Sequence, residues 1–178
     1  DGNRTDTWDS CTDCVPPVTV SVTVDHSDDW NLVGLPSIVV NEHVETVFPE
    51  AIEGTLFRFN ESYFSDSLME NGTGYWLRFD NEGISILTGE ILNEISINLN
   101  EDWNLITGLS EEISIYSASD PGDIIVENTF YGFSEGYFMT DTLVPGNGYW
   151  LRAFQDGEIS FNLGSLRIVG VKNYDLTQ

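Results

Sequence analysis

The chain has 178 residues, 40% of them hydrophobic and 12% aromatic, which is enough apolar material for folded domains and excludes a disordered acidic tail. Thirty Asp and Glu side chains face six Lys and Arg, and the formal net charge of −24 opposes binding to nucleic acid and to anionic membranes. Such a charge suits a setting rich in salt or divalent cations, or it only maintains solubility. No apolar run approaches the roughly 20 residues that a membrane span needs.

Residues 1–17 form an Asp- and Cys-rich leader that ends in two prolines. Because the chain starts at Asp1 without the pattern of a signal peptide, we expect a mature product or an excised fragment. Four carboxylates of the leader are candidate calcium ligands: Asp1, Asp6, Asp9 and Asp13. A complete calcium loop needs a denser run of aspartates before its glycine. A polar linker is therefore the alternative for this segment.

Cys11 and Cys14 are the two cysteines of the chain. A redox C-x-x-C motif is expected at a strand-to-helix junction of an α/β pattern, which this sequence lacks. The two histidines, His26 and His43, do not have the spacing of zinc ligands. We therefore expect Cys11 and Cys14 to form an oxidised pair, a disulfide, in an extracellular protein.

The first predicted element is a strand over residues 18–24, where valines alternate with Thr and Ser. A second strand is predicted from Trp30 and is ended or bent by Pro36. Residues 42–48 are the one helix candidate, one or two turns long before Pro49. The segment from Gly54 to Phe59 is predicted to be a strand.

A repeat organises the rest of the chain. The stretch Gly-Thr-Gly-Tyr-Trp-Leu-Arg from Gly72 returns as Gly-Asn-Gly-Tyr-Trp-Leu-Arg from Gly146, an offset of 146 − 72 = 74 residues. Asp-Trp-Asn-Leu around Trp30 returns around Trp103, an offset of 103 − 30 = 73. We therefore predict two tandem modules, repeat 1 (residues 18–92) and repeat 2 (residues 93–178).

Short alternating segments separated by Gly, Asn and Asp continue through repeat 2, including predicted strands at 95–99, 113–116, 129–133 and 148–153. Many short strands at even spacing predict an all-β protein built of two tandem β-sandwich or barrel-like modules. The pattern alone does not choose between sandwich and barrel.

The repeated Tyr-Trp-x-Arg segment supplies the candidate sites. Neighbouring residues of a strand point to opposite faces, so one aromatic of each pair is expected in the core. An exposed aromatic beside an arginine can stack on a sugar ring or on a partner surface. Packing within the fold is the favoured alternative, and Trp30 and Trp103 are interpreted as core anchors. The candidate ligand contacts are Tyr75, Trp76, Arg78, Tyr149, Trp150 and Arg152.

Acidic pairs precede both repeated tryptophans: Asp28-Asp29 and Glu101-Asp102. They are interpreted either as solvated turn residues, which we favour, or as half of a calcium site that includes Asp28 and Asp29. The sequence contains no nucleophile elbow, P-loop, zinc-protease or dinucleotide motif, and we predict that the protein is not an enzyme.

The repeated motifs Trp-Asn-Leu and Gly-x-Gly-Tyr-Trp-Leu-Arg resemble a tandem β-module of large secreted or surface-anchored proteins of environmental bacteria. The leader is similar, in part, to the Asp- and Cys-rich calcium stalks of thrombospondin type 3 repeats. The resemblance implies an extracellular or cell-surface location and a multidomain setting, and it supplies no catalytic residues. We expect a structural or adhesive module, with a carbohydrate-binding module as the alternative; the partners would be other copies of the chain, surface proteins or glycans.

Strand counting adds a hypothesis about assembly. Segments 18–24, 95–99 and 168–171 are three copies of one alternating strand, although the chain has only two modules. If the first copy is unpaired in its own chain, it can add to the sheet of the next subunit and build a filament.

Overall fold

A computed structural model of the chain describes residues 17–164. The predicted calcium ligands Asp1, Asp6, Asp9 and Asp13 lie outside the described residues, as do Cys11, Cys14 and the expected strand at 168–171.

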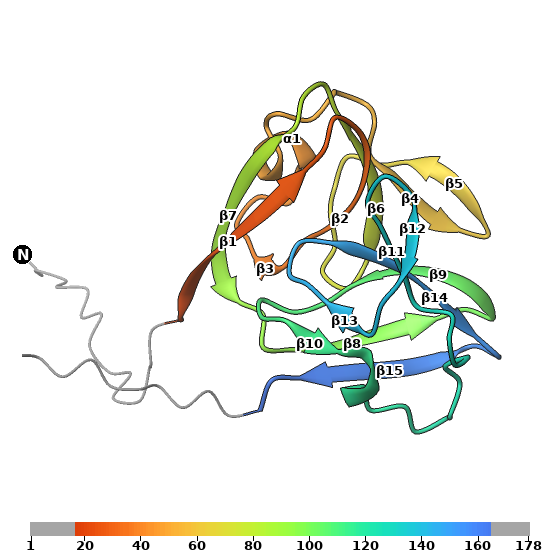
Figure 1. Cartoon of the computed structure of the whole chain (residues 1–178). Helices are drawn as coiled ribbons and strands as arrows, with labels where there is room; N and C mark the ends of the chain where they lie inside the picture. Colours follow the sequence, from red (N-terminus) through yellow and green to blue (C-terminus); the bar gives the residue numbers. More distant parts are fainter. Residues whose placement is uncertain (1–16, 165–178) are drawn as a thin grey trace, which may run out of the picture.

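The fold is all-β and sandwich-like, with antiparallel sheets (Figure 1) and no closed barrel among the described residues. The elements of repeat 1 are β1 (Thr19–His26), β2 (Asp29–Gly34), β3 (Ser37–Ile38), α1 (Val44–Val47), β4 (Phe57–Asn60), β5 (Ser62–Ser65), β6 (Gly74–Phe79) and β7 (Gly83–Ile91). Those of repeat 2 are β8 (Glu94–Leu99), β9 (Asp102–Thr107), β10 (Ile113–Ser114), the 3-10 helix η1 (Ile115–Ser117), β11 (Tyr131–Phe133), β12 (Tyr137–Met139), β13 (Thr142–Leu143), β14 (Gly148–Ala153) and β15 (Gly157–Asn162).

Two of the predicted elements can be compared with the short helices α1 and η1. The helix expected within residues 42–48 is confirmed as α1. The strand expected over residues 113–116 is wrong in its second half, because η1 begins at Ile115. The hydroxyl of Ser114 accepts a hydrogen bond from the Tyr116 N–H and caps this 3-10 turn. Within residues 17–164, neither helix has the length and apolarity of a membrane span.

The two repeats share strand order. Repeat 1 contains the four-stranded sheet β2-β6-β4-β5, and repeat 2 contains the equivalent sheet β9-β14-β11-β12. The register is also shared, since Trp30 lies opposite Arg78 and Trp103 lies opposite Arg152. Equivalent sequence segments therefore occupy equivalent places in the two sheets.

A second sheet in each repeat completes the sandwich. β1 pairs with β7, and its repeat 2 counterpart β8 pairs with β15. The β1 pairing runs from Thr19 opposite Glu90 to His26 opposite Gly83, so the alternating N-terminal strand pairs along its whole length with β7 of its own chain, at the edge of the sheet. The assembly hypothesis required this strand to be unpaired in its own chain, and β1 does not meet that condition.

Each repeat buries its own core between these two sheets. The repeat 1 core contains Val24, Leu35, Phe48, Leu56, Met69, Tyr75, Leu77, Phe79 and Leu87, among others. The repeat 2 core contains Ile97, Leu99, Ile106, Leu109, Ile124, Phe130, Leu143, Tyr149, Leu151, Ile159 and Phe161, among others. One face of each four-stranded sheet is used for this purpose, which leaves its other face to be covered from outside the repeat.

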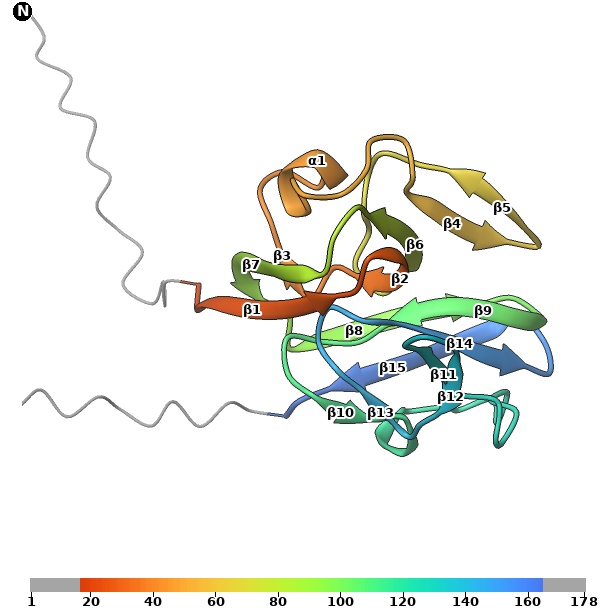
Figure 2. The ribbon, with the colours of Figure 1, turned by 45° about the horizontal axis from the view of Figure 1, so that its top comes forward.

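The other repeat provides that cover. Figure 2 shows β2 and β6 of repeat 1 lying over β9 and β14 of repeat 2. Two equivalent backbone hydrogen bonds tie the repeats together: Gly34 N–H donates to the Gly146 carbonyl at 2.9 Å, and Thr107 N–H donates to the Gly72 carbonyl at 3.1 Å. The repeats are therefore related by an approximate twofold axis that passes between these strands.

The second glycine of each Gly-x-Gly motif allows this approach. A Cβ at Gly74 would lie 2.7 Å from the Ile106 carbonyl oxygen, and one at Gly148 would lie 2.9 Å from that of Val33. Both carbonyls belong to the opposite repeat, and no real Cβ sits so close to a backbone oxygen. These glycines are thus required by the contact between the repeats.

Gly34 and Thr107 are equivalent positions that break the symmetry of the repeat. They face each other at the approximate twofold axis, where a Cβ at Gly34 would overlap the Thr107 side chain. Only one of the two positions has room for a side chain. The Thr107 hydroxyl fills this space and donates a 2.8 Å hydrogen bond to the Asn147 carbonyl.

Candidate functional site

The contact between repeats is a third apolar cluster, separate from the two cores. It buries Leu32, Leu105 and Trp150, with Phe59, Trp76, Tyr131 and Phe133 packed against them. The Phe59 ring meets the Trp150 ring with centroids 4.9 Å apart and planes at 78°. The equivalent pair, Phe133 and Trp76, has centroids 4.8 Å apart and planes at 77°. Each phenylalanine thus packs against the tryptophan of the other repeat.

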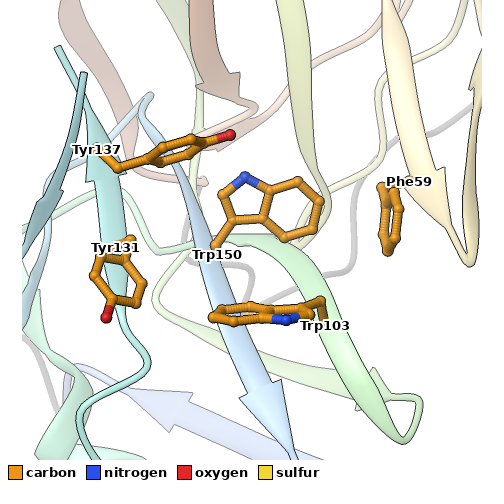
Figure 3. A pocket seen from close by; sticks show the side chains of 5 residues that line it. All are labelled: Phe59, Trp103, Tyr131, Tyr137 and Trp150. Carbon is orange, nitrogen blue, oxygen red and sulfur yellow. The ribbon is translucent and has the colours of Figure 1, made fainter. Parts of the chain in front are cut away.

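Beside this cluster lies an aromatic hollow of about 460 Å³, which we call the Trp150 hollow, lined by Phe59, Trp103, Tyr131, Tyr137 and Trp150. Figure 3 shows the Trp150 ring face-on, with Tyr137 and Trp103 seen edge-on to either side of it, Tyr131 on one flank and Phe59 on the other. Trp150 is only 7% exposed and forms the floor, whereas Trp103 and Tyr137 are exposed at the rim. The hollow therefore presents aromatic faces and edges to a ligand.

The equivalent Trp76 hollow, of about 430 Å³, is lined by Trp30, Phe57, Tyr63, Trp76 and Phe133. Its rings repeat the geometry of the first hollow. The Trp30 and Trp76 rings are 6.4 Å apart at 90°, and the Trp103 and Trp150 rings are 6.3 Å apart at 89°. The described residues therefore form two aromatic hollows with equivalent linings and equivalent ring geometry.

Each hollow is lined by residues of both repeats. Four of the five rings in the Trp150 hollow come from repeat 2, and the fifth, Phe59, comes from β4 of repeat 1. The Trp76 hollow takes four rings from repeat 1 and Phe133 from β11 of repeat 2. A single isolated repeat would lack one wall of its hollow.

The interpretation of Trp30 and Trp103 as core anchors is wrong. Their side chains are 37% and 38% exposed. Alternation along β2 and β9 puts each tryptophan on the same face as Leu32 or Leu105, which is the face between the repeats. The leucines lie under the opposite repeat, whereas the tryptophans extend past its edge and form exposed rims.

The turn before each tryptophan is held by the asparagine after it. Asn31 accepts a hydrogen bond from Ser27 N–H and donates to the Ser27 carbonyl, both at 2.9 Å. Asn104 makes the same pair of bonds with Asn100, at 2.9 and 2.8 Å. These bonds close the turns and fix the direction in which Trp30 and Trp103 enter their strands.

A polar recess adjoins each hollow. The Asp102 recess is lined by Phe59, Glu61, Asn100, Glu101, Asp102, Trp103, Val126, Arg152, Ala153 and Phe154. The Asp29 recess is lined by Asp25, His26, Ser27, Asp28, Asp29, Trp30, Asn31, Leu32, Glu82, Phe133, Ser134, Glu135 and Asn147. Trp103 and Phe59 border both the Trp150 hollow and the Asp102 recess, and Trp30 and Phe133 border both the Trp76 hollow and the Asp29 recess. Hydrogen-bonding groups thus lie directly beside an exposed indole on each side.

Arg152 lines the Asp102 recess, and both predicted arginines are already paired with a carboxylate. Arg78 Nε donates to Asp29 Oδ1 at 2.7 Å, and Arg152 Nε donates to Asp102 Oδ1 at 2.7 Å. Both pairs are exposed to solvent, where such bridges add little stability. The guanidinium groups nevertheless keep further N–H donors for a ligand.

Calcium binding by Asp28 and Asp29 stays a prediction. Asp29 is bound to Arg78, and within residues 17–164 no group of three or more His, Cys, Asp or Glu side chains is suited to a metal ion. Calcium binding by the leader stays a prediction, since its aspartates lie outside the described residues.

The remaining predicted ligand contacts are the Tyr-Trp pairs of β6 and β14, in which neighbouring side chains point to opposite faces of the strand. Tyr75 and Tyr149 are 0% and 2% exposed and belong to the cores, so no ligand reaches their rings. Their hydroxyls accept hydrogen bonds from the N–H groups of Glu70, at 2.9 Å, and Val144, at 2.8 Å. Trp76 and Trp150 point the other way and form the floors of the hollows.

Sequence reasoning did not assign the other walls of the hollows: Phe57, Phe59, Tyr63, Tyr131, Phe133 and Tyr137. A signal for them was present, because Phe57, Phe59 and Tyr63 return 74 residues later as the aromatics Tyr131, Phe133 and Tyr137. Comparisons with protein-family models, with curated proteins and with solved structures gave no match to this chain.

Proposed function

We propose that this protein is a non-catalytic, extracellular adhesion module that binds carbohydrate through its two aromatic hollows. The observation that carries the proposal is the placement of a half-exposed indole, Trp103 or Trp30, between an apolar hollow and a polar recess. A pyranose ring has apolar C–H faces and a rim of hydroxyl groups. An aromatic face beside carboxylate, amide and guanidinium groups matches both parts of such a ligand.

The alternative of a filament built by strand addition has less support. It depended on an unpaired N-terminal strand, and β1 is paired with β7 along its length. The aromatic hollows, by contrast, include partly exposed rings, such as Trp30, Trp103 and Tyr137, that belong to neither core.

The test is a pull-down of the whole chain on insoluble polysaccharides, compared with the variants Trp103→Ala and Trp30→Ala. Tyr116→Ala is the matched control, because Tyr116 is 80% exposed and lines neither hollow. We expect the wild type and the control to bind, and each tryptophan variant to lose most of its binding while its unfolding transition stays cooperative. Retention of full binding by the variant that lacks both tryptophans would exclude the hollows as the binding site.

A further inference from the structure

The two hollows adjoin each other at the approximate twofold axis. The Tyr63 ring, a wall of the Trp76 hollow, lies 6.4 Å from the Trp150 ring that floors the other hollow. The Tyr137 ring, a wall of the Trp150 hollow, lies 6.5 Å from the Trp76 ring. Tyr63 and Tyr137 therefore bring the walls of the two hollows together.

Each polar recess adjoins one hollow, since it shares a tryptophan and a phenylalanine with that hollow. The Asp29 recess thus adjoins the Trp76 hollow, the two hollows meet at the tyrosine pair, and the Trp150 hollow adjoins the Asp102 recess. These features make one groove across both repeats, which suits an extended ligand better than two separate small ones.

The charges around the groove select against anions. The three arginines of residues 17–164 are each paired with carboxylates: Arg58 with Asp66 and Glu70, Arg78 with Asp29, and Arg152 with Asp102. The chain as a whole has a net charge of −24. A uronate or sulfated polymer would meet repulsion from this charge, because a carboxylate already offsets the charge of each arginine.

Resting on the proposed function, we propose that the groove binds one linear, uncharged polysaccharide chain across both repeats, and that the chain consists of pyranoses with equatorial substituents, such as a β-1,4-glucan. Equatorial substituents leave C–H groups on both faces of the sugar, so that no axial hydroxyl is pressed unpaired against an indole. The two halves act on one ligand, and engagement of the second hollow is intramolecular once the first is occupied.

The test is a titration of the full chain, followed by tryptophan fluorescence and calorimetry, with cellobiose, cellohexaose and a glucuronate hexamer of the same linkage. We expect cellohexaose to bind on the order of 10²-fold more tightly than cellobiose, because it reaches both hollows. Trp30→Ala or Trp103→Ala alone should reduce the affinity for cellohexaose to about that for cellobiose, and Tyr116→Ala should leave it unchanged. The glucuronate hexamer should bind at least about tenfold more weakly at low salt, and the difference should narrow as salt is added.

Equal affinity for cellobiose and cellohexaose, or equal affinity for the neutral and charged hexamers, would overturn this inference and leave carbohydrate binding by the hollows intact. Absence of binding to cellohexaose also overturns it. The polysaccharide pull-down then decides separately whether the proposed function survives with another sugar.

Discussion

The Phe59 ring packs against the Trp150 ring with centroids 4.9 Å apart, although one residue belongs to repeat 1 and the other to repeat 2. Phe133 and Trp76 make the reciprocal contact at 4.8 Å. Because the same two phenylalanines wall the hollows, the contact that joins the repeats also completes the candidate binding surface.

This relationship predicts energetic coupling between the repeats. In a double-mutant cycle with Phe59→Ala and Trp150→Ala, the unfolding free energies should show a coupling of about 0.5–1.5 kcal/mol, the range of buried aromatic pairs. Urea denaturation of the four proteins measures it. The control cycle combines Phe59→Ala with Tyr116→Ala, for which the effects should add. Additive effects of Phe59→Ala and Trp150→Ala would show that the contact contributes nothing beyond each ring's own burial.

A second prediction concerns the symmetry-breaking pair at the axis. Gly34→Ala places a Cβ where the Thr107 side chain lies, and we expect it to lower the unfolding free energy by about 1–3 kcal/mol, as overpacking does. Thr107→Gly removes the 2.8 Å hydrogen bond to the Asn147 carbonyl and should also destabilise the protein.

The double variant Gly34→Ala with Thr107→Gly moves the side chain to the other side of the axis and removes the overlap. It should therefore be more stable than the sum of the two single effects, as measured by urea unfolding. Gly136→Ala is the control, because a Cβ there meets no atom within 4 Å. A double variant that shows the full sum of both losses would contradict the proposed contact.

The buried tyrosines predict a loss of stability at alkaline pH. Burial raises the pKa of Tyr75 to about 12 and also raises that of Tyr149. In the unfolded chain tyrosine deprotonates near pH 10, at about its ordinary pKa. Between about pH 10 and 12 the unfolded state therefore holds fewer protons than the folded state, and the unfolding free energy falls as the pH rises. Below about pH 10 both states are protonated and this contribution to stability is complete.

Urea unfolding as a function of pH measures this slope, and tyrosinate absorbance reports the ionisation directly. Tyr75→Phe should reduce the slope at high pH; at neutral pH it should cost about 1 kcal/mol, because the Glu70 N–H loses its acceptor. Tyr116→Phe, at an exposed position, should leave the slope unchanged. An equal slope in the wild type and in Tyr75→Phe would show that Tyr75 ionises alike in both states.

The local features of this fold could be predicted from the sequence because they depend on neighbours along the chain. Alternation of apolar and polar residues gave the strands, and the offset of 73 or 74 residues gave the repeat, whose strand order the two halves share. The same alternation predicted that Tyr75 and Trp76 separate to opposite faces of β6, which their burial confirms.

What covers the second face of each sheet was decided only by the tertiary structure. Alternation along a strand defines two faces and says nothing about which of them meets the other repeat, so the exposure of Trp30 and Trp103 could not be read from their positions. The association of Phe59 with Trp150, and the room for a side chain at Thr107 but not at Gly34, depend on surfaces that meet only after both repeats have folded. The repeat could be recognised from the sequence alone, whereas the groove forms only where the two repeats pack together.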